Sequence, residues 1–156
     1  MTQDLQRITV GPPWTIEDVS WSPSRGVFRL HNADDNDAVV GLTRCLDGRL
    51  RDTYPVSTYD VELTAEGAQT VGGLTDVLRT VGAALLHAEP RCRRIVYAVS
   101  AEGQTLAELA TISAAQAAGF RFVTDVDIVS AELKLFVMEP DWATQSDGYL
   151  DQVPNT

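Results

Sequence analysis

The chain has 156 residues, of which 44% are hydrophobic, and its formal net charge is −10 at pH 7. This length suits one domain of ordinary size, which buries a core without disulfides or metals. The excess of acidic residues argues against nucleic acid and anionic membranes as partners, and we expect neither. No apolar run reaches the length of a membrane span, and the N-terminus lacks the basic and apolar regions of a secretion signal, so the expected location is the cytoplasm.

The N-terminal part of the chain predicts strands and turns rather than helices. Residues 1–25 contain two adjacent prolines and are expected to be irregular. The sequence predicts strands at 26–32 and 38–46, separated by the turn 33–37, which is rich in Asp and Asn. A further strand is predicted at 57–64. Together these segments indicate a meander of antiparallel strands.

The remainder predicts two helices, a central strand and a hairpin. Six apolar residues recur at spacings of three and four and form one stripe of a helix: Val71, Leu74, Leu78, Val81, Leu85 and Ala88. Pro90 ends this helix. The segment 94–100 is rich in β-branched residues and predicts a buried strand. A capping box at 105–108 predicts a second helix that stops before Gly119, and 120–139 predict the hairpin.

This order of elements predicts an α/β (α+β) fold in which helices pack on a mixed, mostly antiparallel sheet. Residues 1–139 are expected to form a single domain, in which the N-terminal half, 1–56, has the less regular pattern. Residues 140–156 contain two prolines and mostly polar side chains, and we expect them to form a C-terminal tail.

Cysteines and histidines are too few and too scattered to predict a metal site. Cys45 and Cys92 have no CxxC or His/Cys spacing and are expected to be reduced, buried thiols. His87 lies near the end of the predicted long helix, where a partly charged imidazole suits the helix dipole. The basic cluster 91–94 could bind an anion or form a solvated loop.

The turn before the long helix has the chemistry of a phosphate site. A helix that begins directly after a strand presents unpaired backbone N–H groups and roughly half a positive charge. Glycines such as Gly72 and Gly73 let a phosphate approach the chain closely. The stretch matches neither the Walker motif nor GxGxxG. A plain strand–helix connection with two packing glycines would have much the same sequence, so both interpretations stay open at this point.

From residue 57 to residue 139 the chain resembles the general acyl-CoA-dependent N-acetyltransferase (GNAT) family. That family's cofactor loop has the pattern Gln/Arg-x-x-Gly-x-Gly/Ala at the start of a long helix, followed by a strand, a shorter helix ending in Gly-Phe and a final antiparallel pair. Gln69, Gly72, the strand at 94–100, the stretch AAQAAGF and the hairpin occur here in that order. The resemblance implies a GNAT-like fold that binds acetyl-CoA or another acyl-CoA.

The resemblance implies that six residues hold the diphosphate of this cofactor: Gln69, Thr70, Val71, Gly72, Gly73 and Leu74. Leu74 stands where the family has Gly or Ala. A rival frame at 79–84 matches the consensus more completely. Its helix would have only about ten residues before Pro90, about 15 Å of length, and its loop would interrupt the apolar stripe, so the first frame is preferred.

The resemblance also implies a carboxylate that removes a proton from the attacking amine. Asp60 and Glu62 share one face of the predicted strand because side chains alternate along it, and either could serve. They could equally be solvated carboxylates on a half-exposed strand. The family's tyrosine acid is missing, since Ala115 occupies its position. Tyr97 is the candidate substitute, although a tyrosine on a strand is more often a core residue.

Two functions are predicted as alternatives. The first is an N-acyltransferase that moves an acetyl or other acyl group from acyl-CoA to a small-molecule amine or a lysine side chain. The second is a non-catalytic GNAT-fold protein that acts as a CoA-binding sensor or a protein-interaction module. The missing tyrosine, Leu74 and the lack of a predicted helix in 1–56 favour the second. A meander that ends in a hairpin is often paired across a dimer, which is compatible with a homodimer.

Overall fold

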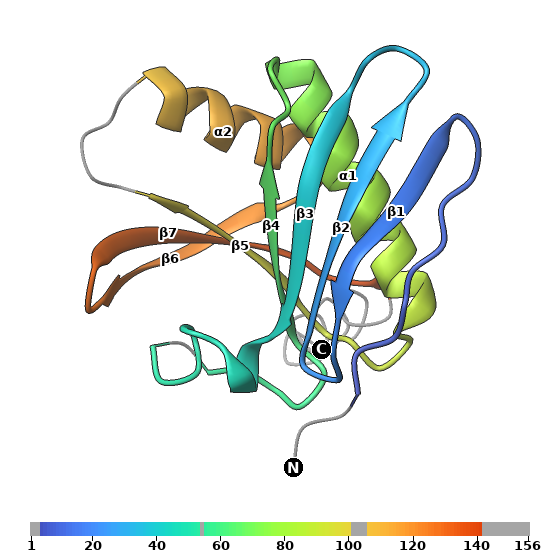
Figure 1. Cartoon of the computed structure of the whole chain (residues 1–156). Helices are drawn as coiled ribbons and strands as arrows, with labels where there is room; N and C mark the ends of the chain where they lie inside the picture. Colours follow the sequence, from blue (N-terminus) through green and yellow to red (C-terminus); the bar gives the residue numbers. More distant parts are fainter. Residues whose placement is uncertain (1–3, 54, 101–105, 142–156) are drawn as a thin grey trace, which may run out of the picture.

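The computed structural model describes residues 4–53, 55–100 and 106–141. Within these residues the chain forms a seven-stranded sheet and two α-helices (Figure 1). The strands are β1 (Trp14–Trp21), β2 (Arg25–Asn32), β3 (Asp37–Arg44), β4 (Val61–Glu66), β5 (Ile95–Ser100), β6 (Arg121–Ile128) and β7 (Ala131–Met138). The helices are α1 (Val71–Ala88) and α2 (Leu106–Ala117), and a short 3₁₀ turn, η1 (Cys45–Asp47), follows β3.

The strand order is β1-β2-β3-β4-β5-β7-β6. Neighbouring strands are antiparallel except β4 and β5, which are parallel and are joined through α1. Short turns can join antiparallel neighbours, whereas parallel neighbours need a longer crossover such as this helix. The predicted fold class, a mixed and mostly antiparallel sheet with helices packed on it, is confirmed.

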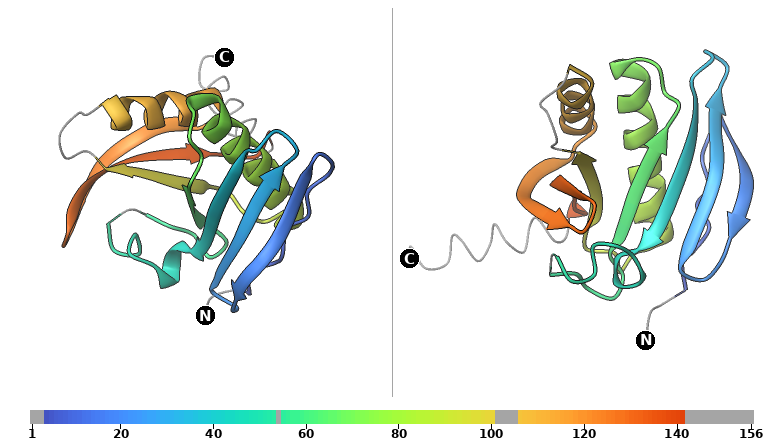
Figure 2. Two further views of the ribbon diagram at one scale, coloured as in Figure 1. Left: turned by 45° about the horizontal axis from the view of Figure 1, so that its top comes forward. Right: turned by 60° about the vertical axis from the view of Figure 1, so that its left-hand side comes forward.

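Both helices pack on one face of the sheet (Figure 2, left). α1 buries Val77, Leu78, Val81 and Leu85 along the predicted apolar stripe. Side chains of this kind each contribute about 1.5–3 kcal/mol when they leave water. The segment between β3 and β4 covers part of the opposite face, where Leu50 belongs to a second apolar cluster with residues of β5, β6 and β7.

Most predicted elements are confirmed, with shifted ends. The predicted strand 38–46 ends as β3 at Arg44, because η1 turns the chain there. The predicted strand 57–64 starts as β4 at Val61, because a turn at 57–60 is closed by a hydrogen bond from the Asp60 amide to the Ser57 carbonyl (3.2 Å). Thr105 of the predicted capping box and residues 142–156 of the predicted tail lie outside the described residues.

The expectation of an irregular stretch over 1–25 is wrong for Trp14–Trp21, which form the edge strand β1. Trp14 and Ile16 pack against the core as β1 pairs with β2. A bulge between Asp18 and Ser20 then shifts the register. A bulge interrupts the two-residue period by which a strand is recognised in a sequence.

A buried ion pair closes the end of the sheet away from the start of α1. Arg44 is fully buried, and its guanidinium donates to Glu89 Oε1 (2.6 Å), to the Tyr59 carbonyl (2.8 Å) and to the Asp4 carbonyl (3.0 Å). Glu89, which caps the C-terminus of α1, also accepts a hydrogen bond from the amide of Gln6 (2.9 Å). These contacts join the N-terminal segment, β3 and α1.

Candidate functional site

The parallel strands β4 and β5 form a fork in the sheet. They pair at only two positions, Val61 with Ile95 and Glu62 with Val96. Beyond these positions β4 continues along β3, and β5 continues along β7. Each strand follows its antiparallel neighbour, so β4 and β5 diverge toward their C-terminal ends (Figure 1). The sheet therefore opens on the side where α1 begins.

The start of α1 carries two backbone amides without an acceptor. Thr70 is the N-cap: its Oγ accepts a hydrogen bond from the Gly73 amide (2.9 Å), and its carbonyl accepts one from the Leu74 amide (2.9 Å). Among the described residues, the amides of Val71 and Gly72 have no hydrogen-bond partner. A Cβ added to Gly72 would meet nothing within 4 Å, so a ligand atom can approach there. The predicted helix start is confirmed.

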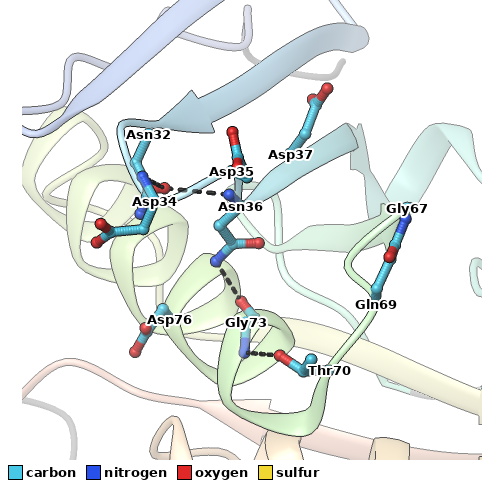
Figure 3. Close-up of a pocket in the computed structure, with 10 residues that line it drawn as sticks. All are labelled: Asn32, Asp34, Asp35, Asn36, Asp37, Gly67, Gln69, Thr70, Gly73 and Asp76. Carbon is cyan, nitrogen blue, oxygen red and sulfur yellow. Dashed lines mark hydrogen bonds between the residues drawn. The ribbon is translucent and has the colours of Figure 1, made fainter.

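The tip of the β2–β3 hairpin packs against the first turn of α1. Asn36 donates from Nδ2 to the Gly73 carbonyl (2.9 Å), as Figure 3 shows. Between hairpin and helix lies a cavity of about 440 Å³. Four carboxylates line it: Asp34, Asp35, Asp37 and Asp76. The described residues that line it include no lysine or arginine, so this side of the helix start repels a diphosphate.

The open side of the helix start faces α2. Residues seven positions apart lie on one face of an α-helix, so Gly72 and Arg79 share a face of α1. Arg79 donates from Nη2 to the Ala117 carbonyl of α2 (3.0 Å), which fixes the direction of that face. An anion that reaches the Gly72 amide from this direction avoids the three aspartates of the hairpin, Asp34, Asp35 and Asp37. The fourth, Asp76, lies on this face of α1 and is paired there with Arg79 (3.4 Å).

Glu62 lies at the apex of the fork, at the last position where β4 and β5 pair. Its side chain is 6% exposed, and Arg49 donates to Glu62 Oε2 from Nη2 (2.8 Å) and from Nε (3.1 Å). Asp60 is also buried, and its carboxylate accepts hydrogen bonds from the Ser57 amide, the Ser57 hydroxyl and the Arg94 amide. The alternative of two solvated carboxylates is therefore wrong.

Tyr97 lies on the face of the sheet opposite to Glu62. It belongs to the core under the helices, where its ring packs against Phe120 with centroids 6.0 Å apart. Val96, the parallel partner of Glu62, belongs to the cluster on the other face. Burial raises the pKa of Tyr97 to about 12. The structure thus brings Glu62 and Tyr97 to the fork but places them on opposite faces of the sheet.

Solved structures match this architecture, whereas no protein-family model and no curated protein matches the sequence. AAC(6')-Ib in complex with paromomycin and acetyl-CoA has a TM-score of 0.63 and 16% identity over 78% of this chain and 68% of that one. A spermidine N-acetyltransferase chimera of SpeG from Vibrio cholerae and hSSAT gives 0.52 and 11%, over 74% and 67%. A putative GNAT-family acetyltransferase from Bordetella pertussis gives 0.52 and 19%, over 73% and 65%. The chain has the GNAT fold.

Within this GNAT fold, the sequence did not reveal two residues that border the candidate site. Arg49 lies just after η1, in the segment between β3 and β4, and donates from Nη2 to Glu62 Oε2. Asn36 belongs to the hairpin tip and meets the first turn of α1. Neither contact follows from a local pattern, because each joins segments that only the packed sheet brings together.

The two cysteines lie apart from the amides of the helix start and are both free and buried, as predicted. Burial raises the pKa of Cys92 to about 12 and raises that of Cys45 as well. Both thiols stay protonated at neutral pH and are poor nucleophiles. In the part of the chain that the structure describes, no helix is long and apolar enough to cross a membrane.

Proposed function

We propose that the chain is an N-acyltransferase that binds acetyl-CoA or another acyl-CoA in the β4–β5 fork. The observation that carries the proposal is that β4 and β5 pair at only two positions before they diverge. Beside the opening between them, the amides of Val71 and Gly72 have no acceptor among the described residues. Where β4 and β5 diverge, the backbone N–H and C=O groups that face the opening no longer hydrogen-bond across it, so they need other partners. An elongated ligand with amide groups can supply them.

The helix start fits the anionic end of this ligand on one side. The amides of Val71 and Gly72, supported by the dipole of α1, suit a diphosphate. Thr70 shapes the turn by capping the Gly73 amide. Gln69, Thr70 and Gly73 line the acidic cavity on the hairpin side, so they border the proposed diphosphate site and the amides of Val71 and Gly72 form it. Leu74 packs against the core, so the residue that departs from the family pattern does not enter the ligand's path.

The proposed chemistry places one proton transfer on the protein. Bound acyl-CoA would supply the thioester carbon that the amine attacks. The C–S bond would break once the C–N bond has formed, and CoA would leave as a thiolate that takes up the second proton lost by the attacking nitrogen. Glu62 takes the proton that an ammonium must lose, which frees the nitrogen lone pair to form the new C–N bond. Asp60, whose carboxylate already accepts three hydrogen bonds, holds the turn before β4.

Tyr97 has a smaller part in this chemistry than its family counterpart. The thiol of CoA has a modest pKa, so CoA can leave as a thiolate without protonation by a strong acid. Burial raises the pKa of Tyr97 to about 12, which weakens it as a proton donor. We expect Tyr97→Phe to keep most of the transferase activity, provided that the core packing against Phe120 is retained.

The acceptor that we propose is a cationic amine, either a small molecule or a lysine side chain. The net charge of −10 attracts cations over a distance. Two of the fold neighbours, an aminoglycoside acetyltransferase and a spermidine N-acetyltransferase, are named for amine substrates. These names support the substrate class.

The test combines a binding arm with a turnover arm. Acetyl-CoA is expected to raise the melting temperature, because a ligand of the folded state stabilises it by mass action. Release of CoA thiol is then followed with a panel of amines, with Glu62→Gln as the variant of the base and Asp60→Asn as its comparison. Full activity in both variants would remove the base assignment, and the lack of any acetyl-CoA effect on melting would remove the proposed function.

A CoA-binding sensor without catalysis is the second candidate. It is favoured by the pairing of Glu62 with Arg49, which occupies the carboxylate that the chemistry needs. A sensor would show the acetyl-CoA shift but no thiol release with any amine. The homodimer and the cytoplasmic location stay predictions, and the mass of the particle in solution tests the first of them.

A further inference from the structure

The candidate base is paired with a cation of its own chain. Arg49 donates to Glu62 Oε2 from two nitrogens, Nη2 at 2.8 Å and Nε at 3.1 Å. Among the described residues the Glu62 carboxylate has no other hydrogen-bond partner. A carboxylate that is nearly excluded from water needs such a partner, because an unpaired buried charge is costly. Whatever binds this carboxylate during turnover must therefore replace Arg49.

Arg49 can leave its carboxylate, in contrast to Arg44 in the buried Arg44–Glu89 pair. The Arg49 side chain is 44% exposed while that of Glu62 is 6% exposed, so the guanidinium lies toward solvent and the carboxylate beneath it. Arg44 is 0% exposed, and its contacts among the described residues include acceptors from three segments, the Asp4 carbonyl, the Tyr59 carbonyl and Glu89. Arg44 cannot move without opening the fold, whereas Arg49 can swing into water and regain its hydration.

A protonated primary amine is a chemical substitute for the Arg49 guanidinium. It carries one positive charge and three N–H donors, which can satisfy the same carboxylate oxygens. We propose that Arg49 holds the place of the acceptor's ammonium group and that the acceptor binds by displacing Arg49 from Glu62. This inference rests on the proposed function and deepens it: the acceptor is bound as a cation, and the free protein is self-inhibited. Neutral nucleophiles such as alcohols do not compete with the ion pair.

Removing Arg49 is expected to strengthen acceptor binding. If the ion pair is closed about nine-tenths of the time, only one molecule in about ten is ready to bind, and the apparent affinity falls about tenfold. Arg49→Gln abolishes that competition. We expect the KM for the amine to fall about tenfold, while the KM for acetyl-CoA stays the same, because the free amides at the start of α1 are untouched.

The matched control is Arg51→Gln. Arg51 lies two residues further along the same segment, is exposed, and its side chain has no hydrogen bond or ion pair among the described residues. The loss of its charge changes the net charge by the same amount as Arg49→Gln. A selective fall in the amine KM for Arg49→Gln alone supports the inference. An equal change in both variants would assign the effect to long-range charge and overturn it.

Displacement itself is observable without turnover. The Arg49 Nε–H group gives a separate nitrogen-proton NMR signal, which its absence in Arg49→Gln identifies. 1,4-Diaminobutane is added at fixed ionic strength, with 1,4-butanediol as the uncharged comparison. We expect the diamine to shift the Arg49 signal saturably and the diol to leave it in place. Arg121 is the matched internal control, because its exposed side chain likewise donates from Nε to a nearly buried carboxylate, Glu139 Oε1 (3.0 Å).

The outcomes separate this inference from the proposed function. An Arg49 signal that ignores saturating diamine, or that moves only as much as the Arg121 signal, overturns the inference even in an active acetyltransferase. A chain that does not bind acetyl-CoA loses the proposed function, while the diamine titration still decides whether Arg49 is displaced. If Arg49→Gln unfolds, Glu62→Gln gives a second reading: its Arg49 signal should already stand at the displaced position and no longer respond to the diamine.

Discussion

Gly72→Glu tests the proposed binding site. The substitution should stabilise the free protein and abolish the further stabilisation that acetyl-CoA provides. Gly72 is exposed, helical and in the first turn of α1, and an added side chain meets no atom within 4 Å. Gly72→Glu should therefore fold normally. A helix residue other than glycine and a negative charge at a helix N-terminus both favour the folded state, by about 1 kcal/mol together.

The magnitudes follow from the position of the residue. About 1 kcal/mol raises the melting temperature of the free protein by about 2–4 °C for a chain of this size. Acetyl-CoA at one hundred times its dissociation constant stabilises the wild type by about 2.7 kcal/mol, which corresponds to about 5–11 °C. In Gly72→Glu the new carboxylate lies where the diphosphate is expected, so this ligand-induced shift should vanish.

Differential scanning fluorimetry with and without acetyl-CoA measures both effects in one experiment. Ala83→Glu is the matched control, because it adds the same charge to an exposed position of the same helix three turns away. That variant should keep the full acetyl-CoA shift. If Gly72→Glu kept the shift as well, the ligand would bind elsewhere and the assignment of the helix start as its site would be wrong.

Three further predictions concern the framework of the site. Glu89→Ala leaves the Arg44 guanidinium buried without its carboxylate, and urea unfolding should show a loss of about 3–5 kcal/mol. Gly82→Val forces a side chain against Met138, whose Sδ would lie 2.5 Å from the first added carbon; the expected loss of about 1–3 kcal/mol should shrink in a double-mutant cycle with Met138→Ala. Burial raises the pKa of the Cys92 thiol from 9.0 to about 12. The unfolded chain therefore loses this proton first as the pH rises, and the free energy of unfolding should fall between pH 9 and about 12, by up to about 1.4 kcal/mol per pH unit. In Cys92→Ala the fall should be less steep.

The elements of the second half could be predicted from the sequence, because their signals are local. The apolar stripe from Val71 to Ala88 repeats with the helix period, Thr70 caps it and Pro90 follows it. The position of the helix start, and with it Gly72 as the candidate anion site, depends on these neighbours alone. The strand β1 escaped recognition because its bulge at Asp18 breaks the period that marks a strand.

The surroundings of the site were decided by tertiary structure. The sequence placed Asp60 and Glu62 on one face of a strand but could not choose between them. Packing separates their surroundings: Asp60 closes a turn with three donors, and Glu62 meets Arg49 at the apex of the fork. The acidic hairpin beside the start of α1 likewise became visible only after folding.

By itself, therefore, the sequence determined where the helices and the strands other than β1 lie, which residue begins the long helix and which side chains can share a face. These properties depend on residues within a few positions of one another. The fork between β4 and β5 was decided by tertiary structure, because it depends on which antiparallel neighbour each strand follows. The partner of Glu62 was decided in the same way, because Arg49 reaches it from the segment that folds over the opposite face of the sheet.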